Sequence, residues 1–237
     1  MTDETLSGAF IELTYFVGEP QLRDSLRALV PRADVSSIPT IILVPNAIGL
    51  VLKPEEIEAK NGRITVRSEG NDFCGVGSGP SESEMRGAGE IVYKRFVEYA
   101  EKVDCLYGAI LIEKSLESPH ELAKGADSDA FGDCFLSRRR LPGSVIERVL
   151  KRVGTLAYVE ETRSGIYISR FPPFNPRQQR LSSPEWHQLS ADIGRIIGEG
   201  LDPKTLRERT EIGRLVARIK IGSVTLWKRI RKRIQIQ

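Results

Sequence analysis

The most apolar stretch of the chain is 40–52, in which two β-branched runs flank the turn-prone pair Asn46-Ala47. The first run reads Thr-Ile-Ile-Leu-Val and the second reads Ile-Gly-Leu-Val-Leu. Runs this short and this apolar favour strands over helices, and their continuity indicates burial on both faces. We therefore predict that they form the central strands of a sheet, with the rest of the chain laid against them.

The remainder of the first 70 residues alternates between strand and helix patterns. Apolar and polar positions alternate within 9–17, which predicts the first strand. Pro20 opens a helical pattern that ends before Pro31, with leucines at helical spacing. Asn61-Gly62 tolerates positive φ at both positions and predicts a hairpin turn before an alternating strand at 63–67.

The region 81–171 repeats this alternation. Ser81 and Glu84 form a capping box that opens a helix to about residue 103, and Ser118 and Glu121 repeat the signature with proline at the first helical position. The pattern further predicts strands at 106–112 and 131–137, a helix from Pro142 to Gly154, and a closing hairpin of 156–160 and 165–171.

These elements predict an α+β fold with a mixed, mostly antiparallel sheet covered by helices, followed by a C-terminal helical basic tail. We expect an α+β domain at 1–175, a proline-rich polar linker at 176–183 and a helical basic segment at 184–237. Ser183-Pro184 and Asp202-Pro203 are the expected helix starts within that last segment.

Composition places the chain among ordinary globular proteins, with 40% hydrophobic and 28% charged residues in a length of 237. The start of the chain lacks a signal-peptide pattern, and no apolar run approaches the roughly 20 residues that span a bilayer. Cys74, Cys105 and Cys134 are widely spaced and odd in number, which argues against a disulfide framework or a zinc knuckle. We therefore expect a cytoplasmic protein with reduced thiols, no metal and no cofactor.

The net charge of +3 conceals an asymmetry along the chain. Residues 201–237 hold eleven lysines and arginines against three acids, a net charge of +8, whereas the other 200 residues hold 24 against 29, a net charge of −5. Segregated charge of this kind is typical of an interaction tail.

The stretch 227–234 carries the densest part of this charge, interleaved with apolar residues. The predicted apolar partner contacts are Ile219, Leu226, Trp227 and Ile230. The predicted contacts to phosphate or to an acidic partner are Lys220, Lys228, Arg229, Arg231, Lys232 and Arg233. The segment could dock into a groove on an acidic protein, neutralise nucleic-acid phosphates, or lie on an anionic membrane. The plain structural alternative is a terminal helix that packs its apolar side on its own body.

Glu56, Glu58 and Lys60 offer the one enzymatic hypothesis, because metal-dependent nucleases of the restriction-enzyme type use a Glu-x-Lys pair. In such enzymes the carboxylates hold the metal and the lysine positions the attacking water. The upstream acid that the site requires is missing, since Asp34 is the only close candidate and lies in a polar loop.

Other chemical cues favour structural roles. The glycine-rich loop 75–79 matches neither the dinucleotide fingerprint nor the P-loop. The acidic loop 127–133 has Phe131 at a position where a calcium loop needs an oxygen ligand. The run 138–140 of three arginines, and the two histidines, fit solvated or structural positions.

The sequence therefore favours a non-enzymatic interaction or adaptor subunit of a larger, prokaryotic assembly, which docks through its basic amphipathic C-terminal helix. The alternatives are a nucleic-acid-binding subunit that uses the same tail and a metal-dependent nuclease of the restriction-enzyme type that uses Glu56, Glu58 and Lys60.

Overall fold

The computed structural model describes residues 10–31, 40–44, 55–69, 81–112, 115–125, 129–170 and 183–201. The strands in these stretches are β1 (Phe10–Phe16), β2 (Thr40–Val44), β3 (Glu55–Lys60), β4 (Arg63–Glu69), β5 (Tyr107–Ile112), β6 (Asp133–Ser137), β7 (Tyr158–Glu161) and β8 (Gly165–Ser169). The helices are α1 (Leu22–Leu29), α3 (Glu82–Val103), α4 (Pro119–Ala123), α5 (Gly143–Val153) and α7 (Pro184–Leu201), with short 3-10 turns η1 (Glu19–Gln21) and η2 (Asp129–Gly132). The predicted α+β class and the predicted antiparallel character are confirmed.

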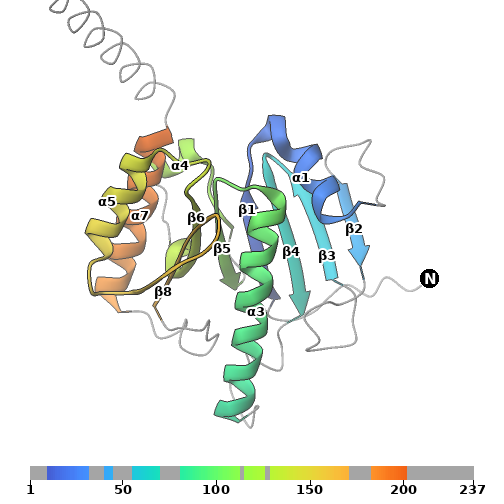
Figure 1. Cartoon of the computed structure of the whole chain (residues 1–237), viewed down its shortest axis with the longest axis horizontal. Coiled ribbons are helices and arrows are strands. Elements are labelled where there is room, and N and C mark those ends of the chain that lie inside the picture. The colour runs from blue at the N-terminus through green and yellow to red at the C-terminus, as the bar shows by residue number, and fades with distance from the viewer. Residues whose placement is uncertain are drawn as a thin grey trace, which may run out of the picture.

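Within the described residues the strands form one eight-stranded sheet in the order β2-β3-β4-β1-β5-β6-β8-β7 (Figure 1). Each neighbouring pair in it is antiparallel. The strands β1 and β5 stand side by side at the centre, and β2 and β7 form the two edges.

The prediction that 40–52 supplies the central strands is wrong for its first run, because β2 lies at an edge and pairs with β3 alone. The tight turn between β3 and β4 fixes those two strands as neighbours, and β1 takes the other side of β4. The outer side of β3 is left open by these pairings, and β2 occupies it. The second run, 48–52, lies outside the described residues.

The hairpin turn between β3 and β4 is the predicted Asn61-Gly62 pair. Both residues have positive φ, 51° and 71°, which is the signature of a type I′ turn. The carbonyl of Gly62 also accepts hydrogen bonds from the backbone N–H groups of Val17 and Gly18, at 2.9 and 3.0 Å. The turn therefore ties β3 and β4 to the end of β1.

A first hydrophobic core fills one face of the sheet on β1, β3 and β4. Leu13, Tyr15 and Val66 point into it from the strands and are buried. α1 and α3 cover it, with Leu26 and Phe96 among the buried contacts (Figure 1).

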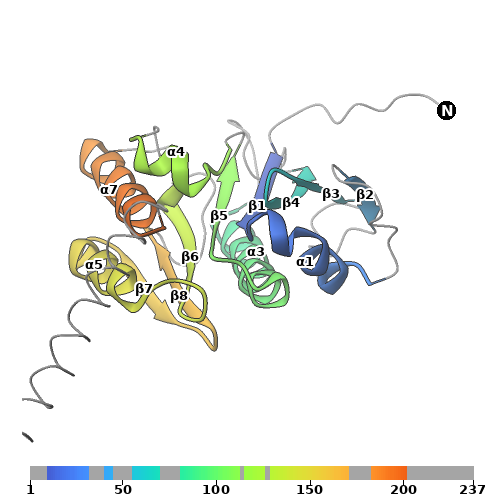
Figure 2. The ribbon, with the colours of Figure 1, turned by 90° about the horizontal axis from the view of Figure 1, so that it is seen from above.

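A second core fills the opposite face of the same sheet, on β5, β6 and β8. Tyr107, Ala109 and Leu111 of β5 belong to this core, while Ile110 between them belongs to the first. The helices α5 and α7 pack over it beside α4 (Figure 2). Strand β5 is therefore buried on both faces.

α7 is part of this second core. Trp186, Leu189, Ile193 and Ile197 are buried in it. The sequence placed this helix at the start of a C-terminal segment, and the structure packs residues 184–201 against the body. No helix in the described stretches is long and apolar enough to cross a membrane.

The C-terminal part of α7 requires a glycine at position 198. A Cβ added at Gly198 would overlap the backbone of Leu122 and Ala123 in α4, which cannot swing aside as a side chain can. Gly87 in α3, by contrast, has open space where its Cβ would stand. Close backbone contact is therefore what seats the C-terminal end of α7.

We predict that Gly198→Ala lowers the free energy of unfolding by about 1–3 kcal/mol, because the added methyl group must push α7 away from α4. The matched variant Gly87→Ala should raise it by about 0.5–1 kcal/mol, since alanine restricts the unfolded chain and favours helix. Urea unfolding of both variants measures the difference. Equal effects at the two sites would contradict the close packing of α7.

Candidate functional site

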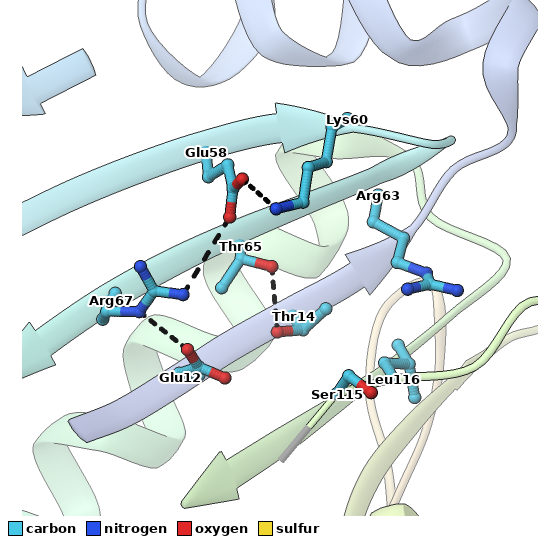
Figure 3. A pocket seen from close by; sticks show the side chains of 9 residues that line it. All are labelled: Glu12, Thr14, Glu58, Lys60, Arg63, Thr65, Arg67, Ser115 and Leu116. Atoms are coloured by element: carbon cyan, nitrogen blue, oxygen red, sulfur yellow. Dashed lines mark hydrogen bonds and ion pairs between the residues drawn. The ribbon is translucent and has the colours of Figure 1, made fainter. Parts of the chain in front are cut away.

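A charged hollow lies where the second core ends and a polar part of the same sheet face begins. Along β1, Glu12 and Thr14 point to the face opposite Leu13 and Tyr15, and Phe16 packs at the border of the second core against Tyr107. The hollow is open on one side and has a volume of about 320 Å³. Its lining consists of Glu12, Thr14, Glu58, Lys60, Arg63, Thr65, Arg67, Ser115 and Leu116 (Figure 3).

Strand register brings these side chains together. Arg67 of β4 stands directly between Glu12 of β1 and Glu56 of β3. One step along, Thr65 stands between Thr14 and Glu58. The polar side chains therefore form parallel rows across three strands.

Arg67 is the centre of one end of the hollow. Its guanidinium donates to Glu12 at 2.7 Å and to Glu56 at 2.5 Å, and Glu58 lies 3.9 Å away. Partial burial alone would lower the pKa of Arg67, but its hydrogen bond to Glu12 and the three nearby carboxylates raise it above its usual value. Arg67 is therefore a tethered cation that holds three carboxylates in place.

The other end of the hollow is richer in donors. Lys60 and Arg63 are direct cross-strand partners beside the hairpin turn. Lys60 forms an ion pair with Glu58, and Arg63 donates through Nη2 to Glu121 of α4 at 2.8 Å. Two cations placed opposite each other repel, so each depends on a carboxylate to its side.

The middle of the hollow is lined by hydroxyl groups. Thr14 and Thr65 hydrogen-bond to each other at 3.2 Å, and Ser115 stands at the far side (Figure 3). Together the lining offers charge at both ends and neutral hydrogen-bonding groups between them.

The Glu-x-Lys hypothesis can now be compared with this geometry. Glu58 and Lys60 do face a common hollow, and Glu12 places there the upstream carboxylate that was not evident from the sequence. Asp34, the only close candidate in the sequence, lies outside the described residues. The position between these carboxylates is occupied by the guanidinium of Arg67. Within the described stretches no group of three His, Cys, Asp or Glu side chains could hold a metal ion.

The predicted tail contacts lie outside the described residues, which end at Leu201. These are Ile219, Lys220, Leu226, Trp227, Lys228, Arg229, Ile230, Arg231, Lys232 and Arg233. The glycine-rich loop 75–79 and Cys74 also lie outside them.

The remaining residues that the sequence singled out form ion pairs or are exposed to solvent. Arg138 pairs with Glu161 and Arg140 with Asp104, while His120 is exposed on α4.

A buried polar cluster lies on the first-core face and was not predicted. Asp133 is only 1% exposed and accepts hydrogen bonds from the hydroxyls of Tyr167 and Ser169. Burial, and then the charge of Asp133, raise the pKa of Tyr167 well above its usual range. Burial likewise raises the pKa of the Cys105 and Cys134 thiols, so neither is an activated nucleophile. Asp133, Tyr167 and Ser169 are closed to solvent, so this cluster has a structural role.

Two ion pairs join α7 to α5. Arg152 donates to Asp192 at 2.6 Å, and Arg148 donates to Glu199 at 2.6 Å. Burial opposes ionisation of Asp192, but its hydrogen bonds to Arg152, Arg195 and Gln188 hold its pKa below the usual value. Together with the buried apolar side chains, these pairs fix α7 up to the point where the described chain ends.

We predict that Arg67→Met and Glu12→Gln are coupled by about 1 kcal/mol in a double-mutant cycle of unfolding, because the pair is partly buried and held by flanking charges. Arg27→Met with Asp24→Asn is the matched control, since that pair lies at 3.7 Å with both side chains exposed. Its coupling should be near zero. If both cycles give the same coupling, Arg67 does not organise the hollow.

We predict that Asp192→Asn destabilises the protein by about 1 kcal/mol at pH 7, since it removes the anion between Arg152 and Arg195. A carboxyl with a lowered folded pKa stabilises fully above its unfolded pKa of about 3.9 and loses that contribution as the pH falls through the folded value. The loss of unfolding free energy that Asp192→Asn causes should therefore become smaller below about pH 4.

The control for this pH dependence is Glu185→Gln, an exposed carboxylate in the first turn of the same helix. Chemical denaturation at pH 7 and at acidic pH measures both variants. A deficit for Asp192→Asn that stays constant between the two pH values would contradict the ion-pair assignment.

Comparisons of the chain with protein-family models, with curated proteins and with solved structures found no match.

Proposed function

We propose that this protein acts by binding, as an interaction subunit whose segment 202–237 docks onto an acidic protein partner. The observation that supports the proposal is the change in charge pairing at Leu201. In the body, basic side chains such as Arg67, Arg148 and Arg152 are paired with carboxylates. The segment after Leu201 holds eleven bases and three acids, so carboxylates within it can pair with few of its cations.

The packing of α7 supports the same proposal. Its apolar side is buried in the second core, its polar side is tied to α5, and Gly198 seats its end against α4. The basic segment therefore follows directly from a helix that is packed against the body. Attachment to a packed helix limits the volume that a docking segment explores. This raises the effective concentration of the segment at a partner held near the body.

The composition of the segment favours a protein partner over nucleic acid. Ile219, Leu226, Trp227 and Ile230 stand at positions i, i+7, i+8 and i+11, which share one face of a helix, and bases lie between them. Such apolar anchors are what a helix-binding groove recognises, whereas phosphate binding requires the cations alone. Trp227 is the expected anchor, because tryptophan is enriched among residues that dominate interface energy.

A capture experiment with three full-length proteins tests this proposal. They are the parent chain, Trp227→Ser combined with Ile230→Ser, and a variant with Lys228, Arg229 and Arg231 changed to Gln. We expect the parent to retain an acidic protein from lysate of its source at about 1 M salt, where charges are screened beyond about 3 Å, and the Trp227 and Ile230 variant to lose it.

Binding of random-sequence duplex DNA is measured beside the capture. A steeply salt-dependent affinity that the charge variant loses and the apolar variant keeps would replace the proposal with nucleic-acid binding. If all three proteins retain the same partner, the docking surface lies elsewhere and the proposal fails.

A further inference from the structure

The donor-rich end of the charged hollow is built from residues with unused hydrogen-bonding capacity. Lys60 has three N–H donors and forms one ion pair in the described structure, with Glu58. Arg63 has five N–H donors and forms one ion pair, with Glu121. The Nε of Arg63 is buried and has no hydrogen-bond partner. A buried donor without an acceptor is costly, and native structures rarely retain one without a reason.

The placement of these two cations is unfavourable except for the carboxylates of Glu58 and Glu121 beside them. Lys60 and Arg63 are direct cross-strand partners, and a like-charged pair in that position destabilises a sheet. The type I′ turn at Asn61-Gly62 gives them no freedom to separate along the strands. An anion bound beside Lys60 and Arg63 would offset this repulsion.

The opposite end of the hollow does not compete for such an anion. Its cation, Arg67, already has Glu12, Glu56 and Glu58 around it. Between the two ends, Thr14, Thr65 and Ser115 offer hydroxyls that donate and accept (Figure 3). The carboxylates of Glu12 and Glu58 add acceptors for hydroxyl groups of a ligand.

We propose that the hollow binds a small, hydroxyl-rich oxyanion, a phosphate monoester or a carboxylate. Lys60 and Arg63 contact its anionic group, and Thr14, Thr65 and Ser115 contact its hydroxyls. The volume of about 320 Å³ suits a ligand of a few carbon atoms. The basic segment 202–237 is a poor occupant, because its cations would meet Lys60 and Arg63.

The proposal is tested by calorimetric titration of the full chain with ribose 5-phosphate, gluconate and ribose. The first two distinguish a phosphate from a carboxylate on similar polyol bodies, and ribose lacks the anion. We expect saturable binding of at least one of the two anions and none of ribose. Failure of both anions to bind overturns the proposal.

Two variants locate the binding. Lys60→Met and Arg63→Met should each weaken it about tenfold or more, because each removes a charge-assisted contact. Lys102→Met on α3, which covers the other face, is the matched control and should bind as the parent does. Anion binding that survives both hollow variants would belong to the basic segment and would overturn the proposal.

Stability measurements separate recognition from folding. Lys60 is half exposed and lies opposite a like charge, so Lys60→Met should unfold at the same urea concentration as the parent or a higher one. Weaker binding together with unchanged stability is the signature of a recognition residue. If Lys60→Met loses binding only because it unfolds more readily, its role is structural and the assignment fails. Neither result depends on the partner proposed for the segment 202–237.

Discussion

The alternation of side chains across β1 and β5 is the constraint on which the rest of the structure depends. Successive residues of a strand point to opposite faces, so a strand between two cores must be apolar on both. β5 meets this condition, since Ile110 enters the first core while Tyr107 and Leu111 enter the second. β1 does not, because Leu13 is in the first core and Glu12 points away from it. The second core therefore stops at the border between these two strands.

The charged hollow is a consequence of that border. On the far side of β1 the face carries polar residues, and the sheet register sets them in rows in which Arg67 meets carboxylates from both neighbouring strands. The α4 region closes the hollow on the side of the second core through Glu121 and Leu116. One end of the hollow is internally satisfied, and the other keeps donors in excess. This asymmetry distinguishes the hollow from a cross-strand ion-pair ladder whose charges are all balanced.

The sequence predicted the elements well because their signals are local. The Asn61-Gly62 turn adopts the positive φ values that its residues tolerate, and Ser118 and Glu121 form both hydrogen bonds of the predicted capping box. Strand order was not predictable in the same way. A continuous apolar run such as 40–44 indicates a strand, but its place in the sheet is decided by which edges the other strands leave open.

The hollow was only partly visible in the sequence. Glu58 and Lys60 were identified as a pair, but Glu12 and Arg67 are 55 residues apart and become neighbours only through the register of β1 and β4. The alternating polar positions of β1 and β4 indicated that each strand has a polar face. They did not show that these two polar faces lie side by side in the sheet. The basic segment, in contrast, is evident from composition alone.

Amide hydrogen exchange of the full chain tests the central claim, that β1 and β5 form the centre of the sheet, that β5 is shared by the two cores and that α7 belongs to the second. The account predicts the slowest exchange in β1 and β5, comparable protection along α7 up to about Ile197, and faster exchange in the edge strands β2 and β7. Slow exchange in β2 together with rapid exchange along α7 would contradict it.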